Sequence, residues 1–207
     1  MGERKAKSSS KNTKPSRSKM ASTISNGSSS TPCSTSGSAT LVRCPEETLL
    51  RLRKLHEAEI ITLFTPFVPH PPVSALAKNM DPFEPLGRAL PRHVRHVPFR
   101  LEYGMTELHA DFLPASGAVV VVICVTDNVL SSNPEAFQQQ VNFAINIWRK
   151  IGETKSIAGI PAILLLASSE ASSRAYADAL HSFPALVSTH GYTTEALVDA
   201  VNVLFGQ

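Results

Sequence analysis

The chain has 207 residues, 43% of them hydrophobic, and a formal net charge of +3. This length supports one sizeable hydrophobic core but not two, so we expect a single folded domain. The longest apolar run, residues 118–125, is much shorter than the roughly 20 residues that a membrane-spanning helix needs, and no apolar signal segment follows the N-terminus. We therefore expect a soluble, intracellular protein of the nucleus or cytoplasm, with no integral membrane part.

The excess positive charge lies at the N-terminus. Residues 1–44 hold eight Lys and Arg and one acidic residue, a charge of +7, whereas residues 45–207 hold twelve basic and sixteen acidic residues, a charge of −4. Ser, Thr and Lys dominate residues 1–44, so burial cannot offset the entropy of ordering them. We expect a disordered tail over residues 1–44, open to phosphorylation, and any contact with nucleic acid is expected through this tail alone.

The folded domain is predicted to span residues 45–207. Pro45-Glu46-Glu47 favours a helix start, because proline fits the first turn and the acidic side chains complement the helix dipole. Residues 60–64 are apolar and β-branched, which predicts a buried strand. Residues 66–98 contain eight prolines and are predicted to form an irregular loop, with one short helix at 73–80. A loop of this length indicates function or partner contact.

The remaining residues alternate between predicted strands and helices. A strand at 97–103 and a helical turn at 107–113 precede residues 118–125, a continuous Val and Ile run that is typical of a central parallel strand. A long helix is then predicted from the cap at residues 133–135 to Gly152. Its apolar positions are Phe137, Val141, Ile145 and Trp148. The other predicted elements are a strand at 160–166, a helix at 171–181, a strand at 185–188 and a helix at 194–205 with Leu197, Val201 and Leu204 inward.

This alternation predicts an α/β fold: a single three-layer domain in which right-handed crossovers connect the strands of a parallel sheet covered by helices on both faces. The stretch from Pro98 to Gln207 resembles the C-terminal two thirds of a Ras-like small GTPase. Phe99–Gly104 corresponds to a strand and its D-x-x-G turn, and Val125-Thr126-Asp127 to the end of the next strand. The helix at 133–151 and the strand opening at Ile160-Pro161 follow in the family's order.

The nucleotide motifs of that family are missing. The P-loop position reads Thr65-Pro66-Phe67-Val68-Pro69-His70-Pro71-Pro72, and prolines lack the amide donors that bind phosphate. The guanine-binding N-K-x-D position holds Ala167-Ser168-Ser169-Glu170, the S-A-K position holds Ser188-Thr189-His190, and Glu102 or Tyr103 replaces the aspartate before Gly104. The resemblance implies a pseudo-GTPase, of which centromere protein M is an example.

No catalytic, cofactor-binding or metal-binding residue is predicted, and no cofactor. The three cysteines, Cys33, Cys44 and Cys124, are not spaced as metal pairs and are expected to be thiols, with Cys124 in the core. The histidines closest in sequence, His70, His93, His96 and His109, are expected on the surface or in loops. No G-x-S-x-G motif surrounds the serine pairs at 168–169 and 172–173, so a hydrolase nucleophile is not predicted.

Three functions remain open at this point. The leading interpretation is a non-catalytic scaffold or adaptor subunit of a larger assembly, such as a kinetochore, that binds protein partners through its helical faces and the 66–98 loop. Phe143 and Trp148 are its predicted anchors. The first alternative is an atypical nucleotide-binding protein of trafficking, with a phosphate site rebuilt around Thr65, Asp127 and Ser168, where open α/β sheets bind ligands. The second is a nucleic-acid binder that acts through the basic tail.

Overall fold

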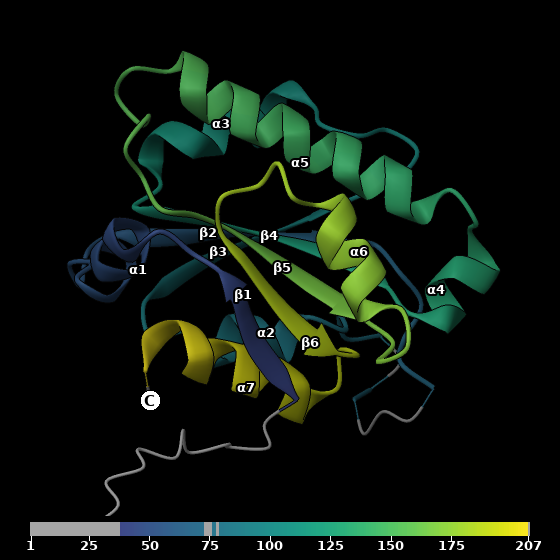
Figure 1. The fold of residues 1–207 in the computed structure, drawn as a ribbon. Helices are drawn as coiled ribbons and strands as arrows, with labels where there is room; N and C mark the ends of the chain where they lie inside the picture. Colours follow the sequence, from purple (N-terminus) through teal and green to yellow (C-terminus); the bar gives the residue numbers. More distant parts are fainter. Residues whose placement is uncertain (1–37, 73–75, 78, 207) are drawn as a thin grey trace, which may run out of the picture. The chain divides into compact units, whose positions relative to one another are not determined.

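The strands form one six-stranded sheet with the order β1-β6-β5-β4-β2-β3 (Figure 1). The computed structural model describes residues 38–72, 76–77 and 79–206. The strands are β1 (Ala39–Arg43), β2 (Ile60–Pro66), β3 (His93–Phe99), β4 (Ala118–Val125), β5 (Ala162–Ser168) and β6 (Leu186–His190). Strands β2 to β6 run parallel, and β1 pairs with β6 in the antiparallel direction. The predicted α/β class and largely parallel sheet are confirmed.

Helices cover both faces of the sheet, as Figure 1 shows. One layer holds α3, α4, α5 and α6, and the other holds α1, α2 and α7. Their bounds are α1 Glu46–Arg53, α2 Glu84–Ala89, α3 Glu107–Phe112, α4 Asp127–Ser132, α5 Ala136–Glu153, α6 Ser173–Ala179 and α7 Thr194–Phe205. A short 3₁₀ turn, Leu113–Ala115, follows α3. The helices predicted near residues 45, 107, 133, 171 and 194 are therefore present.

Strand β4 lies at the centre of the core. All eight of its residues are buried, and it pairs with β5 along Val119–Val125 and with β2 along Ala118–Val121. The continuous apolar run was thus a reliable signal, because a strand between two helical layers has no polar face. At the start of β4, a Cβ on Gly117 would lie 2.6 Å from the Cβ of Glu59, so this close approach requires glycine.

The N-terminal boundary of the domain differs from the prediction. Ala39–Arg43, which was assigned to the tail of residues 1–44, forms strand β1 against β6. Its start is held by Asp199 of α7, whose carboxylate accepts hydrogen bonds from the backbone N–H and the hydroxyl of Ser38, both at 3.0 Å. Partners about 150 residues away supply this order, so local composition could not reveal it. The predicted disorder of residues 1–37 lies outside the described residues.

The prediction of an irregular loop over residues 66–98 is also wrong. This region contains α2 and β3, and β3 begins at His93 rather than at Val97. In the sheet that the described residues form, β3 is an edge strand paired with β2 alone, which explains why Pro98 is tolerated within it. The helix predicted at 73–80 lies partly outside the described residues. The described residues of that range are not helical.

Helix α5 has the predicted position but turns another face to the core. Its buried residues are Ala136, Gln140, Phe143, Ala144, Ile147 and Ile151. Ile145, a predicted core position, is 46% exposed, and Phe143, a predicted partner anchor, is fully buried. The Phe143 ring stacks on Phe99, with ring centroids 3.6 Å apart. Phe143 therefore contributes to the core and cannot contact a partner, whereas Trp148 is half-buried and packs against Phe183.

Candidate functional site

The candidate site lies at the edge of the sheet where the five parallel strands end. Ligands of open α/β sheets bind outside the carboxyl ends of the strands, at the point where the strand order reverses. In this sheet β2 lies between β3 and β4, so the reversal falls between the ends of β2 and β4. The segment that leaves β2, residues 67–72, is bonded through Pro69 and His70 to side chains that follow β4 and β6.

The gap between β2 and β4 is closed by Gln140 of α5. Pairing between the two strands ends at Val121, so the rest of β4 lacks a strand partner on that side. The buried Gln140 side chain accepts a hydrogen bond from the N–H of Cys124 (2.7 Å) and donates to the carbonyl oxygen of Cys124 (2.9 Å). Its amide also donates to the carbonyl oxygen of Ala136. The polar backbone groups at the switch point are thereby satisfied within the domain.

A second network fixes residues 67–72 above the sheet. The hydroxyl of Tyr192 donates to the carbonyl oxygen of Pro69 (2.7 Å), and the amide of Asn128 donates to that hydroxyl (2.7 Å) and to the carbonyl oxygen of His70 (3.1 Å). The hydroxyl of Thr126 in turn donates to the Oδ1 atom of Asn128 (2.7 Å). Burial raises the pKa of Tyr192 to about 12, although the hydrogen bond from Asn128 opposes the shift.

The backbone turn behind Tyr192 depends on glycine. Gly191 has a φ of 83°, in the left-handed region, and its N–H donates to the carbonyl oxygen of Ser168 (2.8 Å). After this turn, Tyr192 reaches the segment that follows β2 through its hydroxyl, and its ring stacks on Phe83, the residue before α2, at a centroid distance of 5.5 Å. The side chains of Asn128 after β4 and Tyr192 after β6 thus link these strand ends to the backbone carbonyl groups of Pro69 and His70 after β2.

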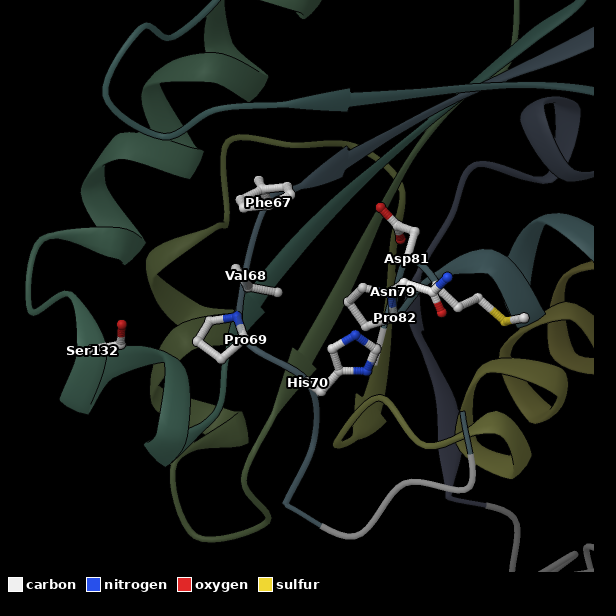
Figure 2. Close-up of a pocket in the computed structure, with 9 residues that line it drawn as sticks. Phe67, Val68, Pro69, His70, Asn79, Asp81, Pro82 and Ser132 are labelled. Carbon is white, nitrogen blue, oxygen red and sulfur yellow. The ribbon is translucent and has the colours of Figure 1, made fainter. Parts of the chain in front are cut away.

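A cavity of about 640 Å³ opens beside residues 67–70, and we name it the Asp81 cavity (Figure 2). Figure 2 shows Phe67, Val68 and Pro69 along one side and Asn79, Asp81 and Pro82 along the other. The lining residues are Phe67, Val68, Pro69, His70, Asn79, Met80, Asp81, Pro82 and Ser132. The volume is within the range of small-ligand sites, roughly 300–1,000 Å³. Apolar groups dominate the lining, and among its described residues Asp81 is the one acidic side chain.

A polar cluster lies behind Asp81. Thr65 is fully buried and its hydroxyl lies 2.8 Å from Nε2 of His96. The same nitrogen is 3.8 Å from Oδ1 of Asp81, and Nδ1 of His96 is 3.6 Å from Oε2 of Glu84. The Thr65 hydroxyl is therefore engaged with His96 and is shielded from solvent. This geometry removes Thr65 from the predicted phosphate site.

Two smaller hollows lie on the same edge. One, of about 280 Å³, lies between residues 67–69 and the segments that follow β3 and α4, and Leu101 and Glu102 line it. The other, of about 320 Å³, includes Asp127, Ser169 and Tyr192, and we name it the Asp127 hollow. Asp127 is exposed at the start of α4, as its position after β4 predicted.

The other residues singled out in the sequence have separate structural roles. Ser168 is fully buried, and its Oγ atom has no hydrogen-bond partner among the described residues. The three residues of the predicted phosphate site therefore do not present their side chains to a common ligand. Cys124 is in the core as predicted, and burial raises its pKa to about 12. It is a free thiol, and so is Cys44.

The four histidines do not form one cluster. His93 is exposed at the start of β3, whereas His70 lines the Asp81 cavity. His109 is buried against Phe64 and Phe143, and this desolvation lowers its pKa. Within residues 38–72, 76–77 and 79–206, no group of three or more His, Cys, Asp or Glu side chains is arranged to hold a metal ion.

The candidate-site residues that the sequence did not reveal are Asp81, Gln140, Asn128 and Tyr192. The contacts of Gln140, Asn128 and Tyr192 span 16 to 123 residues of chain, and Asp81 lies beside His96, 15 residues further on, so no local motif marks them. A buried glutamine in an otherwise amphipathic helix is the one signal that was present in the sequence. In the part of the chain that the structure describes, no helix has the length and apolarity required to cross a membrane.

Comparisons with known proteins support the fold alone. No protein-family model and no curated protein matches the chain. Among solved structures, it is similar to a glycoside hydrolase family 3 β-N-acetylglucosaminidase from Paenibacillus sp. str. FPU-7, with 17% identity, a TM-score of 0.50, and 82% of this chain and 28% of that chain covered. A β-glucosidase from Erythrobacter marinus gives 10% identity, a TM-score of 0.51, and 81% and 27% coverage. A β-glucosidase from Listeria innocua, in complex with gluconolactone, has 17% identity and a TM-score of 0.50, and the match covers 81% of this chain and 23% of that chain.

These similarities correct the interpretation as a pseudo-GTPase. The chain spans about a quarter of the length of the solved chains it matches, and those chains are glycoside hydrolases rather than small GTPases. The segments that suggested a GTPase are strand ends and strand-to-helix connections, which many α/β sheets share. The expectation of a kinetochore subunit rested on that resemblance and is withdrawn with it. The chain is therefore similar in fold to part of several glycoside hydrolases.

Proposed function

We propose that this chain is a non-catalytic protein-binding module, a subunit of a larger assembly, and that it contacts its partner through two exposed aromatic side chains. Phe67 follows β2 and is 68% exposed, and Tyr103 follows β3 and is 71% exposed. We name this pair the aromatic edge. Exposed aromatic side chains are the residues most often found at the energetic centre of protein interfaces.

The two residues of the aromatic edge, Phe67 and Tyr103, follow neighbouring strands, β2 and β3. The N–H of Phe67 donates to the carbonyl oxygen of Phe99, the last residue of β3. Phe67 and Glu102 line the same hollow, and Tyr103 follows Glu102 directly. The guanidinium of Arg100 lies 6.0 Å from the centre of the Phe67 ring, which favours a fixed position for that ring.

The observation that carries the proposal is a contrast at one edge of the sheet. At the strand ends, the buried side chains of Gln140 and Thr65 bond to other groups of the domain, whereas Ser168, whose Oγ atom has no partner among the described residues, is fully buried away from solvent. The large aromatic side chains beside them face solvent. A reactive site needs free polar groups held in place, whereas a contact surface needs free apolar area. The free thiols of Cys44 and Cys124 favour a reducing, intracellular setting for this contact.

The activity of the matched glycoside hydrolases is not part of the proposal. At 17% identity or less, similarity over a quarter of those chains concerns the fold. The nucleic-acid alternative depends on the basic segment within residues 1–37, which lies outside the described residues.

The proposal is tested by photo-crosslinking from the aromatic edge. A benzoylphenylalanine placed at Tyr103 of the full chain should trap a partner in an extract of the source cells, and mass spectrometry then identifies it. With the purified partner, the double variant Phe67→Ser and Tyr103→Ser should bind at least tenfold more weakly than the natural chain, a loss of about 1.4 kcal/mol.

Matched controls separate this surface from general stickiness. Leu50 on α1 and Ile145 on α5 are 45% and 46% exposed but lie on other parts of the domain. The variants Leu50→Ser and Ile145→Ser should keep the natural affinity. Equal loss of affinity in these controls, or crosslinks from position 50 to the same protein, would refute an interface at the aromatic edge.

A further inference from the structure

The Asp81 cavity contains one carboxylate among its described lining residues. The Oδ1 atom of Asp81 accepts a hydrogen bond from the N–H of Phe83 (2.8 Å), which fixes the orientation of the carboxyl group. Among the described residues, no Lys or Arg lies within 4.0 Å of it, and its nearest titratable neighbour is His96 at 3.8 Å. The Asp81 side chain is only 22% exposed, so water screens its charge incompletely.

The rest of the cavity suits the apolar stem of a long side chain. Val68 and Pro82 are buried in its wall, and Phe67 presents an exposed ring at its mouth. The face of that ring is used by the Arg100 guanidinium, whose carbon lies 6.0 Å from the ring centre. The attraction for a positively charged group therefore comes from the Asp81 carboxylate, which has no Lys or Arg partner among the described residues.

We propose that the Asp81 cavity binds a lysine or arginine side chain of the protein partner, with the charged end at Asp81 and the aliphatic stem between Phe67 and Val68. The inference rests on the proposed function and adds the chemistry that the partner must present. A partner is favoured over a free amine because Phe67 belongs both to the cavity and to the aromatic edge. Anionic ligands are disfavoured, since the carboxylate repels them and neither Pro69 nor Pro82 has an N–H to donate.

The cavity is tested with side-chain probes on the full chain. Nα-acetyl-lysine methylamide and Nα-acetyl-arginine methylamide are titrated into the ¹⁵N-labelled protein, and backbone amide shifts are followed by NMR. Both probes should produce saturable shifts at Val68, His70, Asp81 and Phe83 in the millimolar range. The neutral norleucine and citrulline analogues should produce shifts at least tenfold weaker at equal concentration.

Two charge-matched variants locate the binding charge. Asp81→Asn retains an oxygen that can accept the Phe83 N–H, so the fold should persist, and it should weaken lysine binding at least tenfold. Asp127→Asn makes the same charge change in the Asp127 hollow at the same edge and should leave binding unchanged. Equal binding of the norleucine probe, or an effect of Asp81→Asn below twofold, would overturn the assignment.

The inference and the proposed function fail separately. If the Phe67→Ser and Tyr103→Ser variant loses the partner while Asp81→Asn retains full partner affinity, the protein-binding module stands and the lysine or arginine assignment is refuted. If the lysine probe binds at Asp81 but no partner is trapped at position 103, the cavity is a cation site and the proposed interface is refuted.

Discussion

Replacing Gln140 tests how the domain tolerates the divergence of β2 and β4. In the variant Gln140→Leu the side chain keeps its approximate volume but loses the amide. The N–H and the carbonyl oxygen of Cys124 then lose the partners at 2.7 and 2.9 Å that the natural side chain supplies. Both groups are deeply buried, so water cannot replace the lost hydrogen bonds.

The expected loss of stability follows from these two groups. A buried polar group left without a partner costs about 1–3 kcal/mol, so two of them cost about 2–6 kcal/mol. For a domain of this size each kcal/mol lowers the melting temperature by roughly 2–4 °C, which predicts a decrease of about 4–24 °C. A loss of this size is a large fraction of the stability of an ordinary domain, about 5–15 kcal/mol.

The measurement is urea unfolding followed by far-UV circular dichroism and by the fluorescence of Trp148, the single tryptophan of the chain. The control is Gln138→Leu on the same helix, where the exposed side chain bonds only to Asn142. This control should change the free energy of unfolding by less than about 0.5 kcal/mol. If Gln140→Leu also stays within that limit, the reasoning about the switch point is wrong.

Three further predictions concern burial. The pKa of Tyr192 is raised from 10.0 to about 12, so its neutral form stabilises the fold below pH 10 and this contribution is lost as the pH rises toward 12. In alkaline unfolding experiments, the variant Tyr192→Phe should therefore lose less stability between pH 10 and pH 12 than the natural protein. Cys124, whose pKa burial also raises, contributes a loss of the same sign in both proteins. Iodoacetamide should modify Cys124 only when the protein is unfolded in denaturant, and peptide mass spectrometry measures the extent of modification. Modification of Cys124 in the native protein would contradict its buried position. Phe143→Ala should lower the free energy of unfolding by about 3–5 kcal/mol in urea unfolding, whereas Ile145→Ala should lower it by less than about 0.5 kcal/mol. Equal losses in the two variants would contradict the assignment of the α5 core face.

The elements that the sequence predicted well are those whose own side chains determine their environment. Strand β4 is apolar throughout, and α7 has a helical apolar period, so each could be assigned without knowledge of its neighbours. The start of strand β3 was misplaced because His93, Arg95 and His96 interrupt the alternation of polar and apolar residues that marks a half-buried strand. They are accommodated because an edge strand leaves room for polar side chains.

The site was harder to predict than the fold. Asp127 was found because its position after β4 places it at the carboxyl edge whatever the strand order. Asp81 was missed because the cavity that it lines is formed together with residues 67–70, and the sequence does not show that these two segments meet. The likeness to a GTPase misled because motif positions were compared along the chain, whereas the strand order, which separates one α/β topology from another, could not be inferred from spacing.

The direction of β1 determines where attachments to the protein should be made. Because β1 runs opposite to β6, Ser38 lies at the edge of the sheet that carries the Asp81 cavity and the aromatic edge. Helix α7 runs back from that edge, and its last turn meets α1, where the guanidinium of Arg53 donates to the carbonyl oxygen of Leu204 (2.9 Å) (Figure 1). A tag or surface linkage at the C-terminal end therefore leaves the candidate site facing solution in a binding assay, whereas one inserted just before Ser38 would lie at the same end of the sheet as the site, with β6, β5 and β4 between β1 and β2.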